Sequence, residues 1–157
     1  MQKFIFLISI CLISLSCKLS TDFNETVVIP DREWEYSNRA EFVIDEIDTV
    51  SSYDLYLRIR HDKKYEFSNL FLKVYEHQEN SIDTHQRIEL TLAEADGKWR
   101  GENAGNLYMH EYLLKENYKF SDTSSYRIQI EQNMRQNPIL HIADVGVRLV
   151  KHTKNTP

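Results

Sequence analysis

Residues 53–60 read YDLYLRIR, and this stretch decides the fold class. The side chains of Tyr53, Leu55, Leu57 and Ile59 fall on one face of an extended strand, while mostly charged groups fill the other face. Strict alternation of this kind is typical of a β-strand that is buried on one side only. The stretch therefore predicts a half-buried strand whose apolar face lies in a protein core.

The same period-two alternation recurs along most of the chain. Further strands are expected at residues 34–36, 42–45, 70–75, 88–92, 118–121, 126–131 and 145–149. Turn signals such as Asp96-Gly97 separate these runs, and short helical segments are expected only at 109–117 and 133–137. Short strands divided by polar turns predict an all-β fold, a single antiparallel β-sandwich of about seven or eight strands, Ig-like or jelly-roll-like.

The composition is that of an acidic chain of ordinary globular make-up. It has 157 residues, 41% hydrophobic residues and a formal net charge of −5, which fits one domain and offers no basic footprint for nucleic acid. The two cysteines are too few for a disulfide-rich scaffold or a four-cysteine zinc site. The sequence contains no paired-histidine metal motif, serine-hydrolase motif or phosphate-binding loop, so we predict no enzyme, metal site or cofactor. A hydrolase whose carboxylates meet only in the folded chain is the alternative that stays open.

Residues 1–16 have the organisation of a secretory signal. Lys3 precedes an apolar run over residues 4–15, which is shorter than the about 20 residues that span a bilayer and has the length of a signal-peptide core. A small residue, Ser16, stands directly before Cys17, and this resembles a bacterial lipoprotein signal, although Ser14 occupies the usual position of Leu. The resemblance implies that Cys17 is lipidated and becomes the mature N-terminus. A plain secretory signal cleaved nearby is the alternative.

The signal determines the expected organisation and location of the chain. We expect a signal peptide over 1–16, the lipidated cysteine and a polar tether over 17–33, the β-sandwich over 34–151 and a tail over 152–157. Several acyl chains hold a protein stably at a membrane, at ~0.8 kcal/mol per buried methylene. We therefore expect a lipid-anchored protein of the cell envelope, at the outer membrane, with its side of that membrane left open.

Four regions of the sequence resemble a known protein family. They are YDLYLRIR and YEFSNLFL within residues 53–72, DGKWRG at 96–101, QNMR at 132–135 and IADVGVR at 142–148. In this order and spacing they resemble the core of the gliding-motility lipoprotein H (GldH) family. The chain departs from the pattern at Ser125 and His141, where the family often has glycine. Glycine tolerates the widest range of backbone conformations, so a loop can be rebuilt there without a change of role.

The resemblance implies a cell-envelope lipoprotein that is needed for gliding, in bacteria whose motility apparatus is bound up with a dedicated protein secretion system. The expected partners are the membrane, reached through the lipid on Cys17, and other gliding or secretion proteins of the envelope. No catalytic residue is attributed to this family, so none is carried over. We therefore expect a structural or interaction component of the gliding machinery.

An interaction patch is the most specific surface that the sequence offers. Exposed aromatic and arginine side chains contribute most to interface energies, and the candidates here are Tyr56, Arg58, Arg60, Phe71, Tyr75 and Trp99. The simpler interpretation, which we favour for the arginines, is a solvated face with cross-strand ion pairs. Near the last turn, Arg135 and Asp144 are expected to form a structural ion pair that ties a loop to a strand.

Trp99 follows the Asp96-Gly97 turn and supports two interpretations. At a loop tip its ring would stack on a sugar, which gives the alternative function of a glycan-binding envelope lipoprotein that uses exposed aromatic residues. A tryptophan beside a turn more often folds back over the edge of the core, and we favour this second interpretation. A Trp99 packed on the core would remove the main residue of the glycan site.

Overall fold

The computed structural model describes residues 23–45, 47–78 and 84–152. Its elements are β1 (Phe23–Val28), the short 3-10 helix η1 (Pro30–Arg32), β2 (Glu33–Trp34), β3 (Ala40–Ile44), β4 (Tyr53–Asp62), β5 (Asn69–Gln78), β6 (Thr84–Thr91), β7 (Glu102–Ala104), β8 (Leu107–Tyr118), β9 (Tyr126–Gln132), β10 (Ile139–Leu140) and β11 (Ile142–Lys151). In these ranges no helix has the length and apolar character that a membrane crossing needs. The predicted signal peptide, Cys17 and most of the predicted tail lie outside the described residues.

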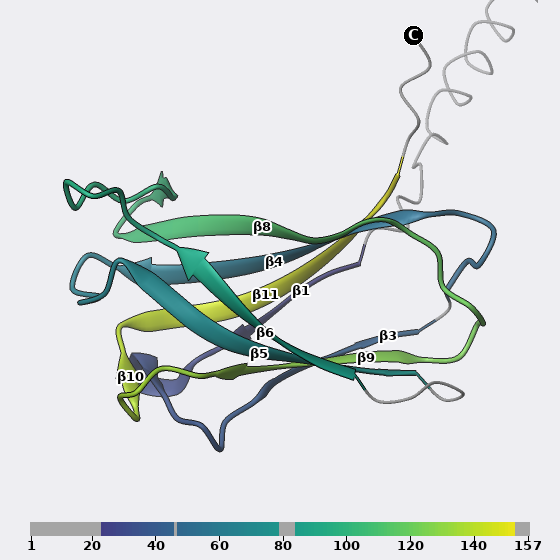
Figure 1. Cartoon of the computed structure of the whole chain (residues 1–157), viewed down its shortest axis with the longest axis horizontal. Helices are drawn as coiled ribbons and strands as arrows, with labels where there is room; N and C mark the ends of the chain where they lie inside the picture. The colour runs from purple at the N-terminus through teal and green to yellow at the C-terminus, as the bar shows by residue number, and fades with distance from the viewer. Residues whose placement is uncertain (1–22, 46, 79–83, 153–157) are drawn as a thin grey trace, which may run out of the picture.

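Two antiparallel sheets face each other across the core, as Figure 1 shows. One sheet has five strands in the order β1-β11-β4-β8-β7, and the other has four strands in the order β3-β9-β5-β6. A two-stranded ribbon of β10 and β2 lies at one end. The predicted all-β sandwich is confirmed. It has eleven strands rather than seven or eight, because the prediction lacks β1 and β8 and because β7 and β10, with three and two residues, are too short to show alternation.

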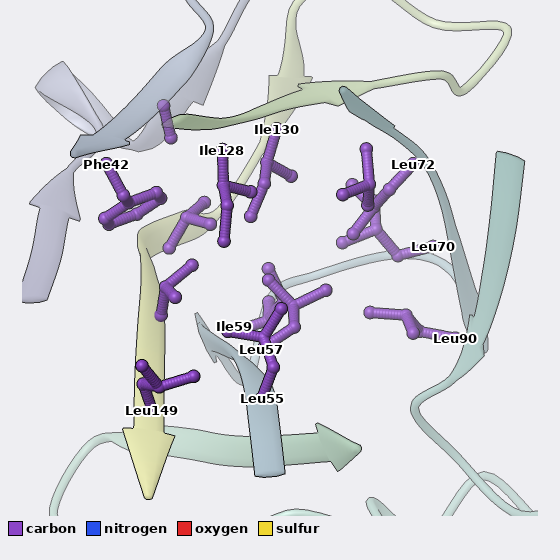
Figure 2. Packing of buried hydrophobic residues seen from close by; sticks show 14 of the residues in the cluster. Phe42, Leu55, Leu57, Ile59, Leu70, Leu72, Leu90, Ile128, Ile130 and Leu149 are labelled. Atoms are coloured by element: carbon purple, nitrogen blue, oxygen red, sulfur yellow. The ribbon is translucent and has the colours of Figure 1, made fainter. Parts of the chain in front are cut away.

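The alternation of β4 organises the core in the predicted way. Tyr53, Leu55, Leu57 and Ile59 are all buried, at 3% exposure or less. Figure 2 shows the apolar layer in which the two sheets meet, with Leu55, Leu57, Ile59 and Leu149 on one side and Phe42, Leu70, Leu72, Leu90, Ile128 and Ile130 on the other. A fully buried side chain of this size contributes about 1.5–3 kcal/mol by leaving water. This layer therefore supplies most of the stabilisation of the fold.

The sandwich begins earlier than predicted, at Phe23 rather than at residue 34. β1 pairs with β11 along its whole length, from Phe23 opposite Leu149 to Val28 opposite Asp144. The polar tether predicted over 17–33 is therefore wrong for residues 23–28. β1 is an edge strand with mostly exposed side chains, and edge strands commonly carry polar and charged residues. Its sequence consequently lacks the apolar alternation on which the prediction depended.

The helix predicted at residues 109–117 is also wrong, because this segment belongs to the strand β8. β8 pairs with β4, and the register shifts twice, between Tyr53 and Leu55 and between Leu55 and Tyr56. Such irregularities break the period-two pattern of a strand. In this irregular part of β8, Lys115 forms an ion pair with Glu76 of the opposite sheet. β8 ends at Tyr118, without the strand predicted over 118–121, and residues 133–137 are irregular, with bends from residue 135, in place of the predicted helical turn.

The two ends of the sandwich are built from different parts of the chain. The start of β1 and the end of β11 lie together at one end, which we name the anchor end. Here Phe23 is opposite Leu149 and Tyr53 is opposite Tyr118. At the opposite end, named the turn end, are the connecting residues 62–68, 92–106 and 133–141. In Figure 1 the anchor end is at the right and the turn end is at the left.

Candidate functional site

The fold brings together the turns of the sequence regions that resemble the GldH family. The loop after β4, the DGKWRG segment and the loop after β9 all lie at the turn end of the sandwich. The turn end contains a buried ring cluster, an ion cluster and an open groove. It is therefore the candidate functional site.

His61 in β4 and His110 in β8 form a buried pair at the centre of the ring cluster. Their Nε2 atoms are 2.9 Å apart, and Nδ1 of His61 is 2.8 Å from the carbonyl oxygen of Asp62. A carbonyl oxygen only accepts, so Nδ1 of His61 carries the proton and its Nε2 accepts from the Nε2–H of His110. Burial lowers the pKa of His110 to about 4, with a smaller contribution from His61. Burial lowers the pKa of His61 as well, so both rings are neutral at pH 7.

Aromatic rings enclose the histidine pair. Between ring centroids, His61 is 4.4 Å from Trp99, 5.2 Å from Tyr65 and 5.6 Å from Tyr108. Trp99 is half-buried and packs against the core. Its ring is thus engaged with His61, as the second interpretation of Trp99 predicts, and the glycan-stacking interpretation loses its main residue.

Two glycines give the DGKWRG segment its shape. Gly97 has a φ of +85°, a conformation that glycine adopts without strain. Gly101 lies directly beside the histidine pair, and a Cβ at this position would be 2.6 Å from Nε2 of His110 and 2.7 Å from the carbonyl oxygen of Met109. The segment therefore folds Trp99 and Gly101 over the two histidines, which gives its residue pattern a structural reason.

Asp62, the last residue of β4, is the centre of the ion cluster. Its Oδ2 accepts from Nη1 of Arg32 at 2.6 Å and lies 3.2 Å from Nδ1 of His141, while its Oδ1 accepts from the backbone N–H of Lys64 at 2.8 Å. Burial raises the pKa of this carboxyl, but the three hydrogen bonds together outweigh burial and hold the pKa of Asp62 below its ordinary value. The charged carboxylate therefore connects η1, the loop after β4 and the residue before β11.

Two partners of Asp62 have a left-handed backbone. Arg32 has a φ of +60° and His141 a φ of +71°, and the N–H of His141 donates to the carbonyl oxygen of Arg32 at 2.8 Å. A positive φ costs a residue other than glycine about 1–3 kcal/mol. His141 occupies one of the two positions where the family often has glycine, and the positive φ gives that preference a physical reason. In this chain the contact of His141 with Asp62 offsets part of the strain.

Asp144 in β11 is bound by Arg60 of the neighbouring strand β4. Nε of Arg60 is 2.8 Å and 2.9 Å from the two carboxylate oxygens of Asp144, which is buried. The predicted Arg135–Asp144 pair is therefore wrong, and Arg135 is exposed. The two residues are close in sequence, but β11 lies in the five-stranded sheet, whereas Arg135 follows β9 of the four-stranded sheet.

A second group of ion pairs covers the outer face of the five-stranded sheet. Glu111 accepts from Nε of Arg58 at 2.7 Å and from Nη2 of Arg148 at 2.9 Å. The guanidinium carbon of Arg148 is 4.9 Å from the ring centroid of Tyr56. These contacts are the cross-strand pairs of a solvated face, which is the simpler interpretation that we favour for the arginines.

The six residues of the predicted interaction patch lie in three separate places. Tyr56, Arg58 and Arg60 are on the outer face of the five-stranded sheet, Phe71 and Tyr75 are on the outer face of the four-stranded sheet, and Trp99 belongs to the ring cluster. The two outer faces point in opposite directions, so the residues do not form one patch. Alternation shows which residues share a strand face, but it does not show which sheet each strand joins.

The groove lies on the outer face of the four-stranded sheet at the turn end, and the sequence did not indicate it. Its volume is about 590 Å³, and its lining includes Phe67, Phe71, Met134, Arg87 and Arg135. These residues come from the loop before β5, from β5, from β6 and from the loop after β9. The QNMR segment contributes only one side of the groove. The residues of the other side, Phe67, Phe71 and Arg87, are distant in sequence, so the sequence contains no local signal for the complete groove.

The buried polar atoms of the turn end are satisfied by protein partners. Throughout residues 23–45, 47–78 and 84–152, every buried side-chain nitrogen or oxygen has a hydrogen-bond partner. In the same part of the chain, no three His, Cys, Asp or Glu side chains are grouped so that they could hold a metal ion. The described polar clusters therefore connect strands and loops.

The chain matches one protein family over most of its length. A family model described as GldH lipoprotein matches residues 21–149. The gliding motility lipoprotein GldH homolog of Christiangramia forsetii is 32% identical over 155 residues, which cover 94% of each chain. The gliding motility lipoprotein GldH of Flavobacterium johnsoniae is 25% identical over 123 residues, which cover 74% of this chain and 76% of that protein.

The matched range agrees with the fold. It includes β1, which the structure places in the sandwich, and it contains the whole turn end. Among solved structures, a VP2 subviral particle of infectious bursal disease virus has a TM-score of 0.35 at 14% identity, with 87% of this chain and 34% of that chain covered. This similarity is too low to indicate a relationship. The chain belongs to the GldH family of gliding motility lipoproteins.

Proposed function

We propose that the chain is a structural and interaction component of the gliding machinery, held at the outer membrane by lipid on Cys17 and linked to the protein secretion system associated with gliding. As a member of a family of gliding motility lipoproteins, it is a lipid-anchored protein of the cell envelope. The observation that carries the proposal is the position of the turn end, opposite the end at which β1 begins.

The short sequence between Cys17 and the fold determines which end lies near the membrane. Five residues, 18–22, separate Cys17 from Phe23 at the start of β1. An extended chain spans at most ~3.3–3.6 Å per residue, so this link reaches roughly 20 Å. The turn end lies farther from the membrane by about the length of β4, which is roughly 30 Å for ten residues. In this arrangement the turn end is the part most accessible to other envelope proteins.

The polar groups of the turn end support a role in contact rather than in catalysis. A general acid or base must reach a proton of its substrate. Asp62 is bound by Arg32, and His61 and His110 are hydrogen-bonded to each other. Groups already engaged in this way hold loops in place and offer partners a preorganised surface.

Site-specific photo-crosslinking in gliding cells tests the proposal. A photoreactive amino acid replaces either Asn106, which is exposed at the turn end, or Val50, which is 85% exposed at the anchor end. We expect the probe at Asn106 to crosslink to a gliding or secretion protein of the envelope and the probe at Val50 not to do so. Crosslinks from Val50 alone, or the same crosslinks from both positions, would contradict the proposal. A Cys17→Ser variant, which should lose incorporation of labelled palmitate, separates failure of the anchor from failure of the contact.

A further inference from the structure

The floor of the groove is apolar and rests on the ring cluster. Phe67 and Phe71 are half-buried, and Met134 packs beside them against the core. The ring of Phe67 is 5.8 Å from that of Tyr65, which in turn is 5.2 Å from the ring of His61. The volume of about 590 Å³ is within the range of pockets that enclose a small ligand or a large side chain.

One wall of the groove is a loop, 133–136, that is held in place by hydrogen bonds. Gln132 is fully buried, its Oε1 accepts from the N–H of Met134 at 2.9 Å and its Nε2 donates to Oδ1 of Asn137 at 3.2 Å. The hydroxyl of Tyr36 donates to the carbonyl oxygen of Met134 at 2.5 Å. A wall that is already ordered loses little conformational entropy when a ligand binds, so the groove is preorganised.

The groove carries two arginines whose charges are not neutralised by described residues. The guanidinium carbon of Arg87 stands 4.7 Å from the ring centroid of Phe71, and Arg135 lies exposed on the loop. Within residues 23–45, 47–78 and 84–152, no ion pair reaches either arginine. The other cations of this sheet face are paired: Arg39 and Lys73 with Glu131, and Arg127 with Glu41. A local excess of positive charge thus lies over an apolar floor, in a chain whose net charge is −5.

We infer that the groove binds an acidic segment of a partner protein, in which an aromatic or large aliphatic side chain is flanked by Asp or Glu. This inference rests on the proposed function and names the chemistry of the partner. The apolar side chain packs on Phe67, Phe71 and Met134, while the flanking carboxylates pair with Arg87 and Arg135. Arginine forms bidentate bonds with carboxylates, and charge complementarity of this kind favours one partner over another.

Peptide binding to the full chain, purified with its anchor in detergent micelles, tests the inference. The probes are the fluorescent peptides Asp-Glu-Phe-Glu-Asp, Ser-Gln-Phe-Gln-Ser and Lys-Arg-Phe-Arg-Lys. We expect the acidic peptide to bind about tenfold more tightly than the neutral one and the basic peptide not to bind. The double variant Arg87→Glu with Arg135→Glu should weaken binding of the acidic peptide by at least about tenfold.

The matched control is the double variant Lys63→Glu with Lys64→Glu, which reverses two exposed charges at the turn end outside the groove. It should leave the affinity for the acidic peptide nearly unchanged. The inference is overturned if the neutral peptide binds as well as the acidic one, or if the two double variants weaken binding equally. Circular dichroism checks that both variants are folded.

Two other occupants would also overturn the inference. Sedimentation would show a dimer that the Arg87→Glu/Arg135→Glu variant dissociates if a second copy filled the groove. Flotation with vesicles containing phosphatidylglycerol would show variant-sensitive binding if the groove faced an anionic membrane. The inference stands or fails on these binding measurements, whereas the proposed function fails on the crosslinking in gliding cells, so the two failures are distinguishable.

Discussion

The Nε2 atoms of His61 and His110 lie 2.9 Å apart in the buried ring cluster of the turn end, where the Nε2–H of His110 donates to His61. This hydrogen bond joins β4 to β8 directly beneath the DGKWRG segment. It forms only while His61 is neutral, because a protonated His61 would present a donor to a donor, whereas His110 can donate through its Nε2–H in either protonation state. This hydrogen bond therefore depends on the protonation state of His61, and burial disfavours a charge on either ring.

Mild acidification should weaken the fold before most carboxylates titrate. Burial lowers the pKa of both histidines, that of His110 from 6.5 to about 4. Below pH 6.5 the unfolded chain therefore binds protons that the folded chain excludes. For His110 the free energy of unfolding should fall from about pH 6.5 towards about pH 4, by up to ~1.4 kcal/mol per pH unit, and His61 should add to this loss in the same direction. Urea titrations at a series of pH values measure this slope.

The His110→Gln variant serves as the control for that slope. A glutamine amide keeps a donor that can reach Nε2 of His61, but it does not titrate. The variant should show a shallower loss of stability over the same pH range, with the remaining slope due to His61. Equal slopes for the variant and the wild type would assign the pH dependence to other groups.

Replacement of Gly101 by alanine should be the most damaging of the glycine substitutions at the turn end. The added Cβ would be 2.6 Å from Nε2 of His110 and 2.7 Å from the backbone oxygen of Met109. We expect a loss of roughly 3 kcal/mol, at the upper end of the usual cost of overpacking. In the comparison variant Gly105→Ala, the Cβ has nothing within 4 Å and only the φ of +74° is strained, so the loss should be roughly 1–2 kcal/mol. Urea unfolding measures both, and the reverse order would refute this explanation.

Two substitutions at position 141 distinguish the cost of backbone strain from the contribution of the side-chain contact. His141→Ala keeps the unfavourable φ of +71° and loses the contact with Asp62, so it should lower the free energy of unfolding. His141→Gly loses the same contact but relieves the strain, and we expect it to be more stable than the alanine variant by about 1 kcal/mol. Thermal unfolding of the three proteins checks the order. A glycine variant less stable than the alanine variant would show that the positive φ is not strained.

The contribution of the Arg60–Asp144 pair to the free energy of unfolding should be measurable by comparison with a substitution of the exposed Arg135. Arg60→Gln leaves the buried carboxylate of Asp144 without its charged partner, and we expect a loss of about 1–3 kcal/mol. Arg135→Gln removes a charge that touches no described carboxylate, and the change should stay within about 0.5 kcal/mol. Urea unfolding of both variants gives the comparison. Equal losses of stability in the two variants would contradict this assignment and would favour the Arg135–Asp144 pair that the sequence alone predicts.

The sequence predicts the strands in which every second side chain is buried, but it does not predict β1 or β8. β4 was predicted because burial of one face imposes alternation on every second residue, from Tyr53 to Ile59. β1 was missed because an edge strand with few core contacts does not need that pattern. The pattern of β8 predicts a helix because the register shifts opposite Leu55 disrupt the alternation.

The candidate site depends even more on long-range placement. The DGKWRG and QNMR segments pointed to turns, and Trp99 was expected to cover the core edge. The order of the strands places His61 and His110 beside the DGKWRG segment. It also places Arg87 beside the QNMR segment. Strand order also decides that Asp144 meets Arg60. A single sequence carries no local signal for such contacts, because they depend on which strands become neighbours.

Gliding speed of cells with substitutions at opposite ends of the sandwich tests the central claim most directly. One strain carries Asn103→Arg with Asn106→Arg at the turn end, and the other carries Thr49→Arg with Val50→Arg at the anchor end. Palmitate labelling and protease resistance confirm that both proteins are anchored and folded. If the turn end contacts the gliding machinery, the first strain loses most of its gliding speed and the second glides normally. Normal gliding of the first strain, or loss of gliding in the second strain alone, would contradict the account.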